Sequence, residues 1–555
     1  MNLRGVGVSP GIGHGPAYVL AVSVPEPPEG ATYTGEADQE KERAMSALTQ
    51  VAGELEARGH QAGGEAEDIL KAQALMAEDP GLVVKVRSLI DRGLAAPRAV
   101  FEAFGKYRDV LAGAGGYLGE RAADLDGIRD RVIALLYGIA LPAAPTAPAE
   151  PYVLVARDLA PADTALLSRE QVVAFVTEEG GPTSHTAIIA RAMGVPAIVA
   201  CPGATGIPQG VQVMADGTTG VVHVEPAAAD VADAVGADTA RQAALGAARG
   251  PGRTADGHPV PLLANIGSPA ELGDAVRAGA EGVGLFRTEF LFLGRTEPPS
   301  AEEQREAYRA ALEAFPGGRM VVRTLDSGAD KPLEFLPWPA AEPNPALGER
   351  GLRRARRFPE VMEAQLDALA ALESERLAVM APMVATAEEA GWFVQECRSR
   401  GLPDVGVMIE IPSAALRAED LVSQVDFVSV GTNDLAQYAF AADRQLAAMS
   451  ALHDPWQPAL LDLVAMTAAA AAGAGRPCGI CGEAAADPAL ACVLVGLGAS
   501  TLSMTAAALP AVRAALAAHT LEQCERAAEA ARAQITAARA RTAARARLSG
   551  LATLG

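Results

Sequence analysis

The 555-residue sequence contains few aromatic residues, few cysteines and no long uninterrupted apolar stretch. Aromatic residues make up 4% of the chain although half of it is hydrophobic, which favours closely packed helices over bulky aromatic cores. Six cysteines in so long a chain do not form a disulfide framework, so we expect a reducing compartment and a cytoplasmic protein. The longest apolar stretches are too short to span a bilayer, and the N-terminus, with its Gly and Pro residues, does not match a signal peptide.

Positive charge is also scarce. The chain has 46 Lys and Arg residues against 68 Asp and Glu residues, a formal net charge of −22. Binding to nucleic acid depends on neutralising phosphates with Lys and Arg, so this balance argues against a nucleic-acid partner. An anionic small molecule is not excluded, because it needs only a local cluster of cations.

The length predicts roughly two to four domains. Two Pro-rich segments, Val24–Gly30 and Leu141–Pro151, enclose a charged, Ala-rich segment whose apolar residues recur at helical spacing. We therefore expect a helical bundle over residues 30–140, inserted into an α/β domain made of residues 1–25 and 150–225. The β-rich runs that support the α/β domain are Tyr152–Ala156, Val172–Thr177, Ala197–Val199 and Val211–Met214.

The second half of the chain carries the most regular pattern. Residues 226–258 have little hydrophobic periodicity and are interpreted as a linker or an exposed helix. After them, apolar runs alternate with helical stretches, a pattern typical of a (β/α)₈ barrel, which we expect over residues 259–520. Residues 521–555 are expected to form a polar C-terminal helix and tail. The eight predicted barrel strands are Val260–Ile266, Gly282–Phe286, Met320–Leu325, Leu377–Met383, Val405–Ile411, Asp426–Gly431, Arg476–Cys481 and Ser500–Met504.

Polar and charged residues follow the ends of these predicted strands, where (β/α)₈ barrels hold their reacting groups. Two carboxylates, Glu410 and Asp434, are the hard oxygen ligands that suit Mg²⁺. The arginines suit a small phosphorylated acid, because guanidinium binds carboxylate and phosphate bidentately. The alternative is that some of these charges form structural ion pairs. The candidate residues at this rim are Arg287, Arg323, Glu410, Asn433, Asp434, Arg444 and Cys481.

A second candidate site lies in Gly180–Arg191, which reads GGPTSHTAIIAR. The Gly-Gly turn puts Thr183, Ser184 and His185 at the start of a predicted helix, where free N–H groups and the helix dipole favour a phosphoryl group. The same environment disfavours imidazolium and keeps the imidazole neutral and nucleophilic at neutral pH. A capping or surface role for His185 is the alternative.

Cys478 and Cys481 have the spacing of a redox CxxC motif, but they end a predicted barrel strand instead of opening a helix. No second cysteine pair or suitably spaced histidine accompanies them, so a zinc site is not expected. Gly11–Gly15 is Gly-rich without matching a nucleotide-binding fingerprint. We therefore assign neither redox or zinc chemistry to the cysteine pair nor nucleotide binding to the glycines.

These segments in this order resemble Enzyme I of the bacterial phosphoenolpyruvate:sugar phosphotransferase system, over nearly the whole chain. Its relatives pyruvate phosphate dikinase and phosphoenolpyruvate synthase share several of them, but those proteins carry a large ATP-binding domain where this chain has only the helical insertion. The matching segments are GVSPG (Gly7–Gly11), the His185 segment (Gly180–Arg191), GLFRTEFLF (Gly284–Phe292), RTLD (Arg323–Asp326), NPALGER (Asn344–Arg350), EIPSA (Glu410–Ala414), GTNDLAQY (Gly431–Tyr438) and CGEAA (Cys481–Ala485).

The resemblance implies a phosphoenolpyruvate-protein phosphotransferase in which His185, phosphorylated on Nε2, carries the phosphoryl group. It also implies that Arg287, Arg323 and Arg444, assisted by Asn433, hold the phosphate and carboxylate of phosphoenolpyruvate. The fold implied is a swivelling α/β phosphohistidine domain with an inserted helical bundle, followed by a (β/α)₈ TIM-type barrel.

The same resemblance implies that Glu410 and Asp434 bind Mg²⁺ beside the substrate and that Cys481 protonates the enolate carbon. The bundle would bind the histidine-containing phosphocarrier HPr, the barrel would form a homodimer, and the reaction would be the first step of sugar uptake. One histidine has to visit the barrel to load and the bundle to unload, so the α/β domain is expected to swivel.

Two alternatives remain open from the sequence. One is a dikinase-like or synthase-like enzyme that uses a nucleotide, and the other is a regulatory phosphoenolpyruvate-binding protein without transfer activity. The sequence also departs from the usual family pattern at Pro182, in DSGADK (Asp326–Lys331), at Gln445-Leu446 and at Gln457. These departures remove no group that the chemistry needs, so they bear on rate and partner fit.

Overall fold

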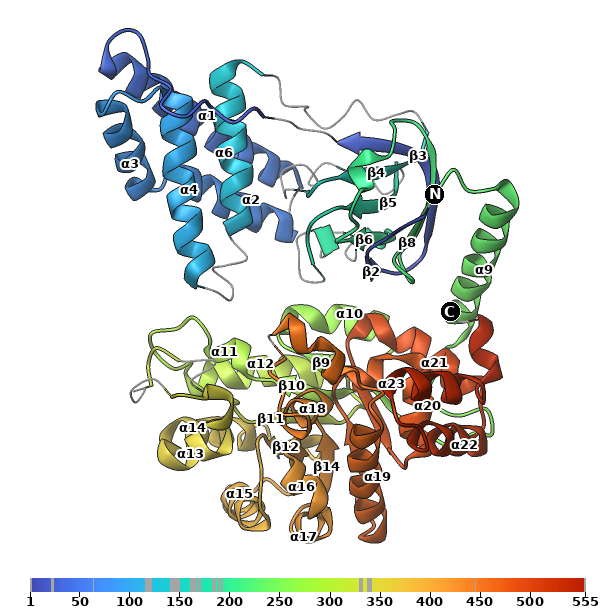
Figure 1. Ribbon diagram of the computed structural model, residues 1–555. Coiled ribbons are helices and arrows are strands. Elements are labelled where there is room, and N and C mark those ends of the chain that lie inside the picture. The colour runs from blue at the N-terminus through green and yellow to red at the C-terminus, as the bar shows by residue number, and fades with distance from the viewer. Residues whose placement is uncertain are drawn as a thin grey trace. The chain divides into compact units, whose positions relative to one another are not determined.

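The computed structural model describes residues 2–20, 24–62, 64–114, 122–139, 150–159, 167, 171–181, 186–187, 190, 193–328, 333–336, 342–444 and 446–553. The chain divides into two compact units, Met1–Thr239 and Ala240–Gly555, which are described one at a time (Figure 1). Among the described residues, no helix has the length and apolar character that crossing a membrane requires.

The first unit contains a mixed β-sheet whose described strands follow the order β1-β8-β7-β3-β4-β5-β6-β2. Strands β3 to β6 run parallel in its centre, and the flanking pairs are antiparallel. Alternate residues of β4 enter two separate apolar clusters, so both faces of the central strands are covered. The strands are β1 (Asn2–Arg4), β2 (Val6–Ser9), β3 (Ile12–Leu20), β4 (Tyr152–Ala156), β5 (Val172–Thr177), β6 (Ala197–Val199), β7 (Gln212–Asp216) and β8 (Val221–Val224).

The four strands predicted for this domain are confirmed, and the structure adds β1, β2, β3 and β8. The Gly-rich segment Gly11–Gly15 lies at the start of β3. Its glycines allow close backbone approach: a Cβ at Gly13 would come within 2.2 Å of the carbonyl oxygen of Val173, and one at Gly15 within 2.8 Å of that of Pro151. Close packing of β3 against neighbouring backbone therefore accounts for these glycines, and the lack of apolar residues at their positions concealed the strand in the sequence.

The predicted helical bundle is present in the first unit and has an apolar core of its own. The Asp79–Pro80–Gly81 break ends one helix and begins the next: the Asp79 side chain accepts a hydrogen bond from the Leu82 N–H at 2.9 Å, and Pro80 is the first helical residue. The described helices are α1 (Ala37–Ala62), α2 (Gly64–Ala77), α3 (Pro80–Asp91), α4 (Ala96–Ala114) and α6 (Ala122–Tyr137).

Of the two interpretations of residues 226–258, the structure supports a helix for most of the segment. Helix α9 (Ala228–Ala247) is largely exposed along its length and crosses the boundary between the two units.

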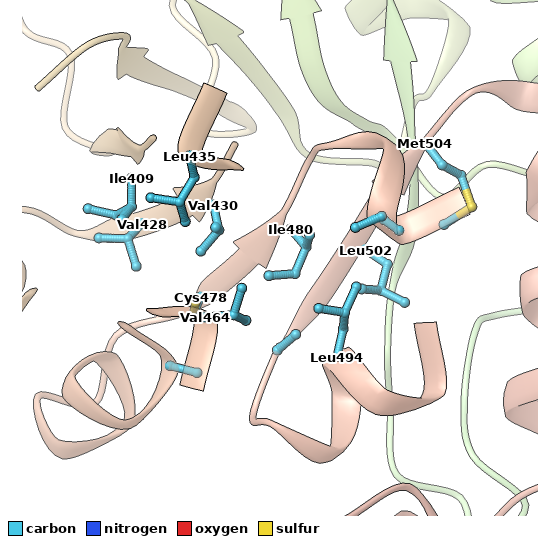
Figure 2. Packing of buried hydrophobic residues seen from close by; sticks show 14 of the residues in the cluster. Ile409, Val428, Val430, Leu435, Val464, Cys478, Ile480, Leu494, Leu502 and Met504 are labelled. Atoms are coloured by element: carbon cyan, nitrogen blue, oxygen red, sulfur yellow. The ribbon is translucent and has the colours of Figure 1, made fainter. Parts of the chain in front are cut away.

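The second unit is built on a closed barrel of parallel strands, and all eight predicted strands are confirmed. Outward-facing residues such as Ile409, Val428 and Ile480 pack beneath the surrounding helices (Figure 2). A smaller cluster that includes Leu285, Met380 and Met408 fills the interior. The strands are β9 (Leu262–Ile266), β10 (Val283–Arg287), β11 (Met320–Arg323), β12 (Leu377–Ala381), β13 (Val405–Ile409), β14 (Phe427–Val430), β15 (Cys478–Ile480) and β16 (Thr501–Met504).

The helices around the barrel begin with clear capping signals in several places. Ser300 and Thr386, for example, accept hydrogen bonds from the backbone N–H groups of Glu303 and Glu389 in capping boxes. The helices are α10 (Leu272–Arg277), α11 (Glu289–Phe292), α12 (Ala301–Ala314), α13 (Leu352–Arg357), α14 (Pro359–Ala370), α15 (Ala387–Ser399), α16 (Pro412–Leu416), α17 (Ala418–Val422), α18 (Thr432–Ala439), α19 (Pro458–Gly473), α20 (Pro488–Gly496) and α21 (Leu509–Ala517).

The expectation of one polar C-terminal helix is wrong in detail. The segment forms two helices, α22 (Leu521–Arg532) and α23 (Ala537–Arg545), and α23 is capped by the Thr536 side chain. Cys524, Ala527 and Ala531 on α22 are buried in the same cluster as the outer layer of the barrel. Arg and Glu residues are numerous between these alanines, so the segment is polar on average, which explains why it resembles a solvated helix in sequence.

Candidate active site

A pocket of about 290 Å³ opens at the carboxyl ends of the barrel strands. The seven barrel residues that the sequence analysis selected all line it, so residues from five strand ends or the loops after them meet in one place. They are Arg287, Arg323, Glu410, Asn433, Asp434, Arg444 and Cys481.

Arg323 ends β11 directly beside Arg287, the last residue of β10, because these two residues are paired across the parallel strands. The Arg323 guanidinium forms a close ion pair with Glu289 and lies 3.6 Å from Asp326. Burial alone would lower the pKa of Arg323, but the surrounding carboxylates, Glu289 first among them, raise it above its usual value. Arg323 therefore presents a permanent positive charge to the pocket.

Arg350 is a pocket residue that the sequence analysis did not select. It is 1% exposed and forms a two-point ion pair with Asp326, at 3.0 Å from Nε and 2.9 Å from Nη2. Its Nη1 lies 3.3 Å from Asp434 and 3.3 Å from the Tyr438 hydroxyl. Arg350 belongs to the NPALGER segment, which was the available signal, but it comes from a long loop instead of a strand end.

Glu410 and Asp434 both line the pocket, both are buried, and they are close enough for the charge of Asp434 to act on Glu410. One Glu410 oxygen accepts a hydrogen bond from the Met383 N–H at 2.7 Å. Burial and the neighbouring Asp434 carboxylate raise the pKa of Glu410 to about 8. Two carboxylates held together in a dry environment favour a bound cation, which stabilises both in their ionised form.

The loop after β14 holds Asn433, Asp434 and Arg444. The Asn433 side-chain oxygen accepts a hydrogen bond from the Glu483 N–H at 3.2 Å. Arg444 Nη1 lies 3.5 Å from Asp434, and the Arg444 N–H donates to the Gln437 side chain at 3.1 Å. Arg444 is about one-third exposed, so it borders the opening of the pocket while Arg350 and Arg323 lie deeper.

Cys481 follows the last residue of β15 and belongs to the interior cluster of the barrel. Its N–H donates to the Val430 carbonyl at 3.1 Å, and its thiol lies 3.5 Å from the same oxygen. Burial raises the pKa of the Cys481 thiol to about 11, although a hydrogen bond with Ser429 opposes the shift. The thiol is therefore protonated at neutral pH, as a proton donor must be.

Cys478 does not share this environment. It is outward-facing and packs in the outer layer of the barrel with Ile480 and Val464 (Figure 2). Successive strand residues alternate between faces, so the two cysteines of the CxxC motif lie on opposite sides of the barrel wall. All six cysteines are free thiols, and no group of three or more His, Cys, Asp or Glu side chains that suits a metal occurs in the described part of the chain. The opposite orientations of Cys478 and Cys481 argue against their acting as a redox pair.

The pocket lining balances opposite charges. Four arginines face five carboxylates, a formal charge of −1 when all are ionised. The raised pKa of Glu410 favours its neutral form at neutral pH, which leaves the lining with no net charge. A divalent cation beside Glu410 and Asp434 would favour the ionised form of both carboxylates and leave the pocket with a net positive charge, which attracts a phosphorylated acid of charge −2 or −3.

The second candidate segment is described only in part. His185 lies outside the described residues, as do Thr183 and Ser184, so its environment stays a prediction. Pro182, Ala329 and Gln445, at which the sequence departs from the family pattern, are outside them too, as is Lys331. Gln457 is described: its side chain donates to the Ala451 carbonyl at 3.1 Å, and it does not line the pocket.

Known protein families and individual proteins match this sequence over nearly the whole chain. Three family models match: PEP-utilising enzyme, N-terminal, over residues 4–121; the mobile domain over 148–220; and the PEP-binding domain over 241–521. The phosphoenolpyruvate-protein phosphotransferase of Streptomyces coelicolor is 58% identical over 554 residues, 99% of each chain. Proteins of the same name from Haloferax volcanii and Bacillus subtilis are 41% and 37% identical, and the matches cover 93% and 92% of this chain and 94% and 93% of theirs. The chain belongs to the phosphoenolpyruvate-protein phosphotransferase family of PEP-utilising enzymes.

Proposed function

We propose that this chain transfers the phosphoryl group of phosphoenolpyruvate to His185 and then to the phosphocarrier HPr, as the first step of sugar uptake by a phosphotransferase system. The observation that carries the proposal is the convergence of four arginines, two buried carboxylates and a protonated thiol on one pocket. The proposed bounds are those expected from the sequence: residues 1–25 and 150–225 carry His185, residues 30–140 receive the carrier, residues 226–258 are the linker between these parts and the barrel, and residues 259–520 bind phosphoenolpyruvate. Residues 521–555 form the proposed C-terminal region.

The arginines of the pocket bind the substrate in this proposal. Arg287, Arg323 and Arg444 hold the phosphate and carboxylate, and Asn433 assists through its side chain. The carboxylates that surround Arg323 and Arg350 fix the two guanidinium groups before the substrate arrives. Groups that are already oriented cost little to reorganise when charge develops in a loose phosphoryl-transfer transition state.

The metal that we propose is Mg²⁺. Glu410 and Asp434 would hold it, and the fit rests on these two neighbouring buried carboxylates, because burial and their mutual repulsion raise the pKa of Glu410 and a bound cation relieves that repulsion. When bound, Mg²⁺ supplies positive charge to the phosphate and to the developing enolate.

The reaction balances with the residues named. The P–O bond of phosphoenolpyruvate breaks as a P–N bond to His185 Nε2 forms, and the bonding electrons pass to the enolate oxygen. Cys481 then donates its thiol proton to the enolate carbon to give pyruvate, and the thiolate regains a proton from water. The raised thiol pKa keeps the donor protonated until the enolate forms.

The proposal is tested with purified chain, Mg²⁺ and phosphoenolpyruvate labelled in the phosphoryl group. We expect one acid-labile, alkali-stable label per chain, located on His185 by peptide mapping, which passes to added HPr. Removal of divalent cations with EDTA should prevent labelling, and Mg²⁺ should restore it. A chain that binds phosphoenolpyruvate but takes up no label would instead support the regulatory alternative, and a requirement for ATP would support the dikinase-like one.

The helical bundle is the proposed carrier-binding surface. Leu75 on α2 is 74% exposed and Val84 on α3 is 66% exposed, although both are large apolar side chains. The segment from Glu36 to Asp79 has 11 Asp and Glu residues against 4 Lys and Arg residues. Exposed apolar side chains on a bundle whose first part is acidic suit a carrier with a basic patch around its own histidine.

Leu75→Glu is expected to raise the KM for HPr by about tenfold or more, because it puts a charge into the apolar part of the proposed interface. Labelling of the chain itself by phosphoenolpyruvate should stay unchanged. The control is Ile535→Glu in the second unit, since Ile535 is 78% exposed in the structure. An equal effect of both substitutions on the KM would argue against the bundle as the docking surface.

We also propose that the barrel forms a homodimer. Leu347, Leu446 and Met449 are exposed apolar residues close to a second pocket of about 520 Å³, which lies between residues 343–347 and 437–444. This apolar surface next to the active site suits a second copy of the chain.

Leu347→Glu is expected to weaken the dimer by about tenfold or more, since a charge would have to be buried against the partner. Leu416→Glu is the control, because Leu416 is 59% exposed and Leu347 is 63% exposed. Sedimentation equilibrium of the full chain measures both. If Leu347→Glu dimerises as tightly as the unmodified chain, the proposed surface is wrong.

The proposed location is cytoplasmic. The free state of all six thiols supports it.

A further inference from the structure

Asn265 makes an unusual set of contacts at the top of the barrel interior. It lies near the end of β9, paired with the inward-facing Leu285 of β10. Its side-chain nitrogen donates to the Cys481 carbonyl at 3.1 Å and lies 3.4 Å from the Ser503 carbonyl. Its side-chain oxygen accepts a hydrogen bond from the Ser503 hydroxyl. One side chain thus joins three strands around the residue after β15.

The space for this arrangement is provided by Gly284. A Cβ at that position would come within 2.5 Å of the Ser503 hydroxyl oxygen and 2.6 Å of its Cβ. Ser503 is 3% exposed, so its hydroxyl is held inside the barrel wall. Because the hydroxyl can donate only to the Asn265 oxygen in this pair, it orients the amide with its nitrogen towards Cys481.

Apart from the bond from Asn265, the hydrogen bond that the described residues make to the Cys481 backbone comes from the side of β14. β15 is three residues long and ends before Cys481, whose N–H donates to Val430 on β14. The hydrogen bond from the Asn265 side chain to the Cys481 carbonyl holds the backbone on the side opposite to β14. Together the two bonds set the orientation of the peptide units from which the thiol projects into the pocket.

We propose that Asn265, oriented by Ser503, is a positioning residue for the Cys481 thiol. The inference rests on the proposed role of Cys481 as the proton donor to the enolate carbon. Asn265 does not line the pocket, so it acts through Cys481 and not on the substrate. Proton transfer to carbon is sensitive to the distance and angle of the donor, and a shift of about 1 Å in a reacting group lowers rates by up to about 100-fold.

The test uses the full chain with pyruvate and Mg²⁺ in D₂O and measures exchange of the pyruvate methyl hydrogens by NMR. Asn265→Ala removes the hydrogen bond to Cys481, and Asn265→Asp removes the donor while keeping the size of the side chain. We expect both to lower the exchange rate by about 10- to 100-fold. Phosphoenolpyruvate affinity, measured by calorimetry, should change by less than about twofold in Asn265→Ala, since the arginines are untouched.

Ser500→Ala is the matched control. The Ser500 hydroxyl donates to the Cys478 carbonyl and accepts from the Cys478 N–H, both at 3.0 Å, at the other end of the same strand. If Asn265 only stabilises the barrel, then Ser500→Ala should slow exchange as much as Asn265→Ala does when the two variants lose the same thermal stability. That result would overturn the inference, as would equal losses of exchange and of phosphoenolpyruvate affinity in Asn265→Ala.

Cys481→Ala separates this inference from the function on which it rests. If Cys481→Ala exchanges as fast as the unmodified chain, Cys481 is not the proton donor, and the positioning role of Asn265 is wrong as well. If Cys481→Ala loses exchange but the Asn265 variants exchange within twofold of the unmodified chain, the positioning role alone is wrong. Loss of exchange in all three variants, with substrate binding retained in Asn265→Ala, is the result that we expect.

Discussion

Replacement of His185 by alanine is expected to lower phosphoryl transfer from phosphoenolpyruvate to HPr by a factor on the order of 10⁴ or more, because His185 is the proposed carrier of the phosphoryl group between the two partners. Exchange of the pyruvate methyl hydrogens should stay within about twofold of the unmodified rate. That reaction needs only the barrel pocket, whose residues all belong to the second unit. Labelled phosphoenolpyruvate and NMR exchange measure the two activities in the same preparation.

The control for His185→Ala is His223→Ala. His223 lies on β8 in the same sheet-containing unit and has no proposed role in transfer. Transfer that survives in His185→Ala would show that the phosphoryl group travels by another residue. Loss of both activities in His185→Ala would indicate a folding defect and would remove the support for a separate barrel reaction.

Asp326→Asn is expected to have the largest effect on stability. Asp326 is 1% exposed and forms the two-point ion pair with Arg350, which is equally buried. The substitution keeps the shape but leaves a buried guanidinium facing a neutral amide. Removing one partner of such a pair destabilises by about 3 kcal/mol. Urea unfolding followed by tryptophan fluorescence measures the second unit selectively, because Trp338, Trp392 and Trp456 all lie within it.

Asp404→Asn provides the comparison for Asp326→Asn. Asp404 pairs with Arg319 at 2.8 Å, but both side chains are about one-third exposed. A solvated pair of this kind contributes about 1 kcal/mol or less. Equal destabilisation by the two substitutions would mean that burial of the Asp326–Arg350 pair has little energetic effect, and that Arg350 finds other partners when Asp326 is neutralised.

The barrel could be predicted from sequence because parallel strands covered on both faces are continuous apolar runs. The same reasoning failed for β3, where Gly13 and Gly15 replace the apolar signal with glycines that close backbone approach requires. The two C-terminal helices were interpreted as one solvated helix because their many Arg and Glu residues make the segment polar on average, although its alanines are buried.

The site residues divide in the same way. Arg287, Arg323 and Glu410 follow strand ends, so the closed topology of a barrel is by itself enough to bring them together. Arg350 comes from the long loop after β11, and the sequence does not predict where such a loop places its residues. Asn265 is inside a strand run and acts through hydrogen bonds to a backbone carbonyl, which leave no trace in residue spacing.

The arrangement of the CxxC motif has a consequence for how the enzyme withstands oxidants. A cysteine oxidised to sulfenic acid is recoverable when a nearby thiol condenses with it, and otherwise oxidation proceeds to sulfinic and sulfonic acids. Among the described residues of the barrel interior, Cys481 is the sole cysteine, since Cys478 faces the other side of the wall. Within the described part of the barrel interior, no second thiol can therefore condense with an oxidised Cys481. Burial and the raised thiol pKa are what protect Cys481 from oxidants, because both keep the oxidisable thiolate scarce.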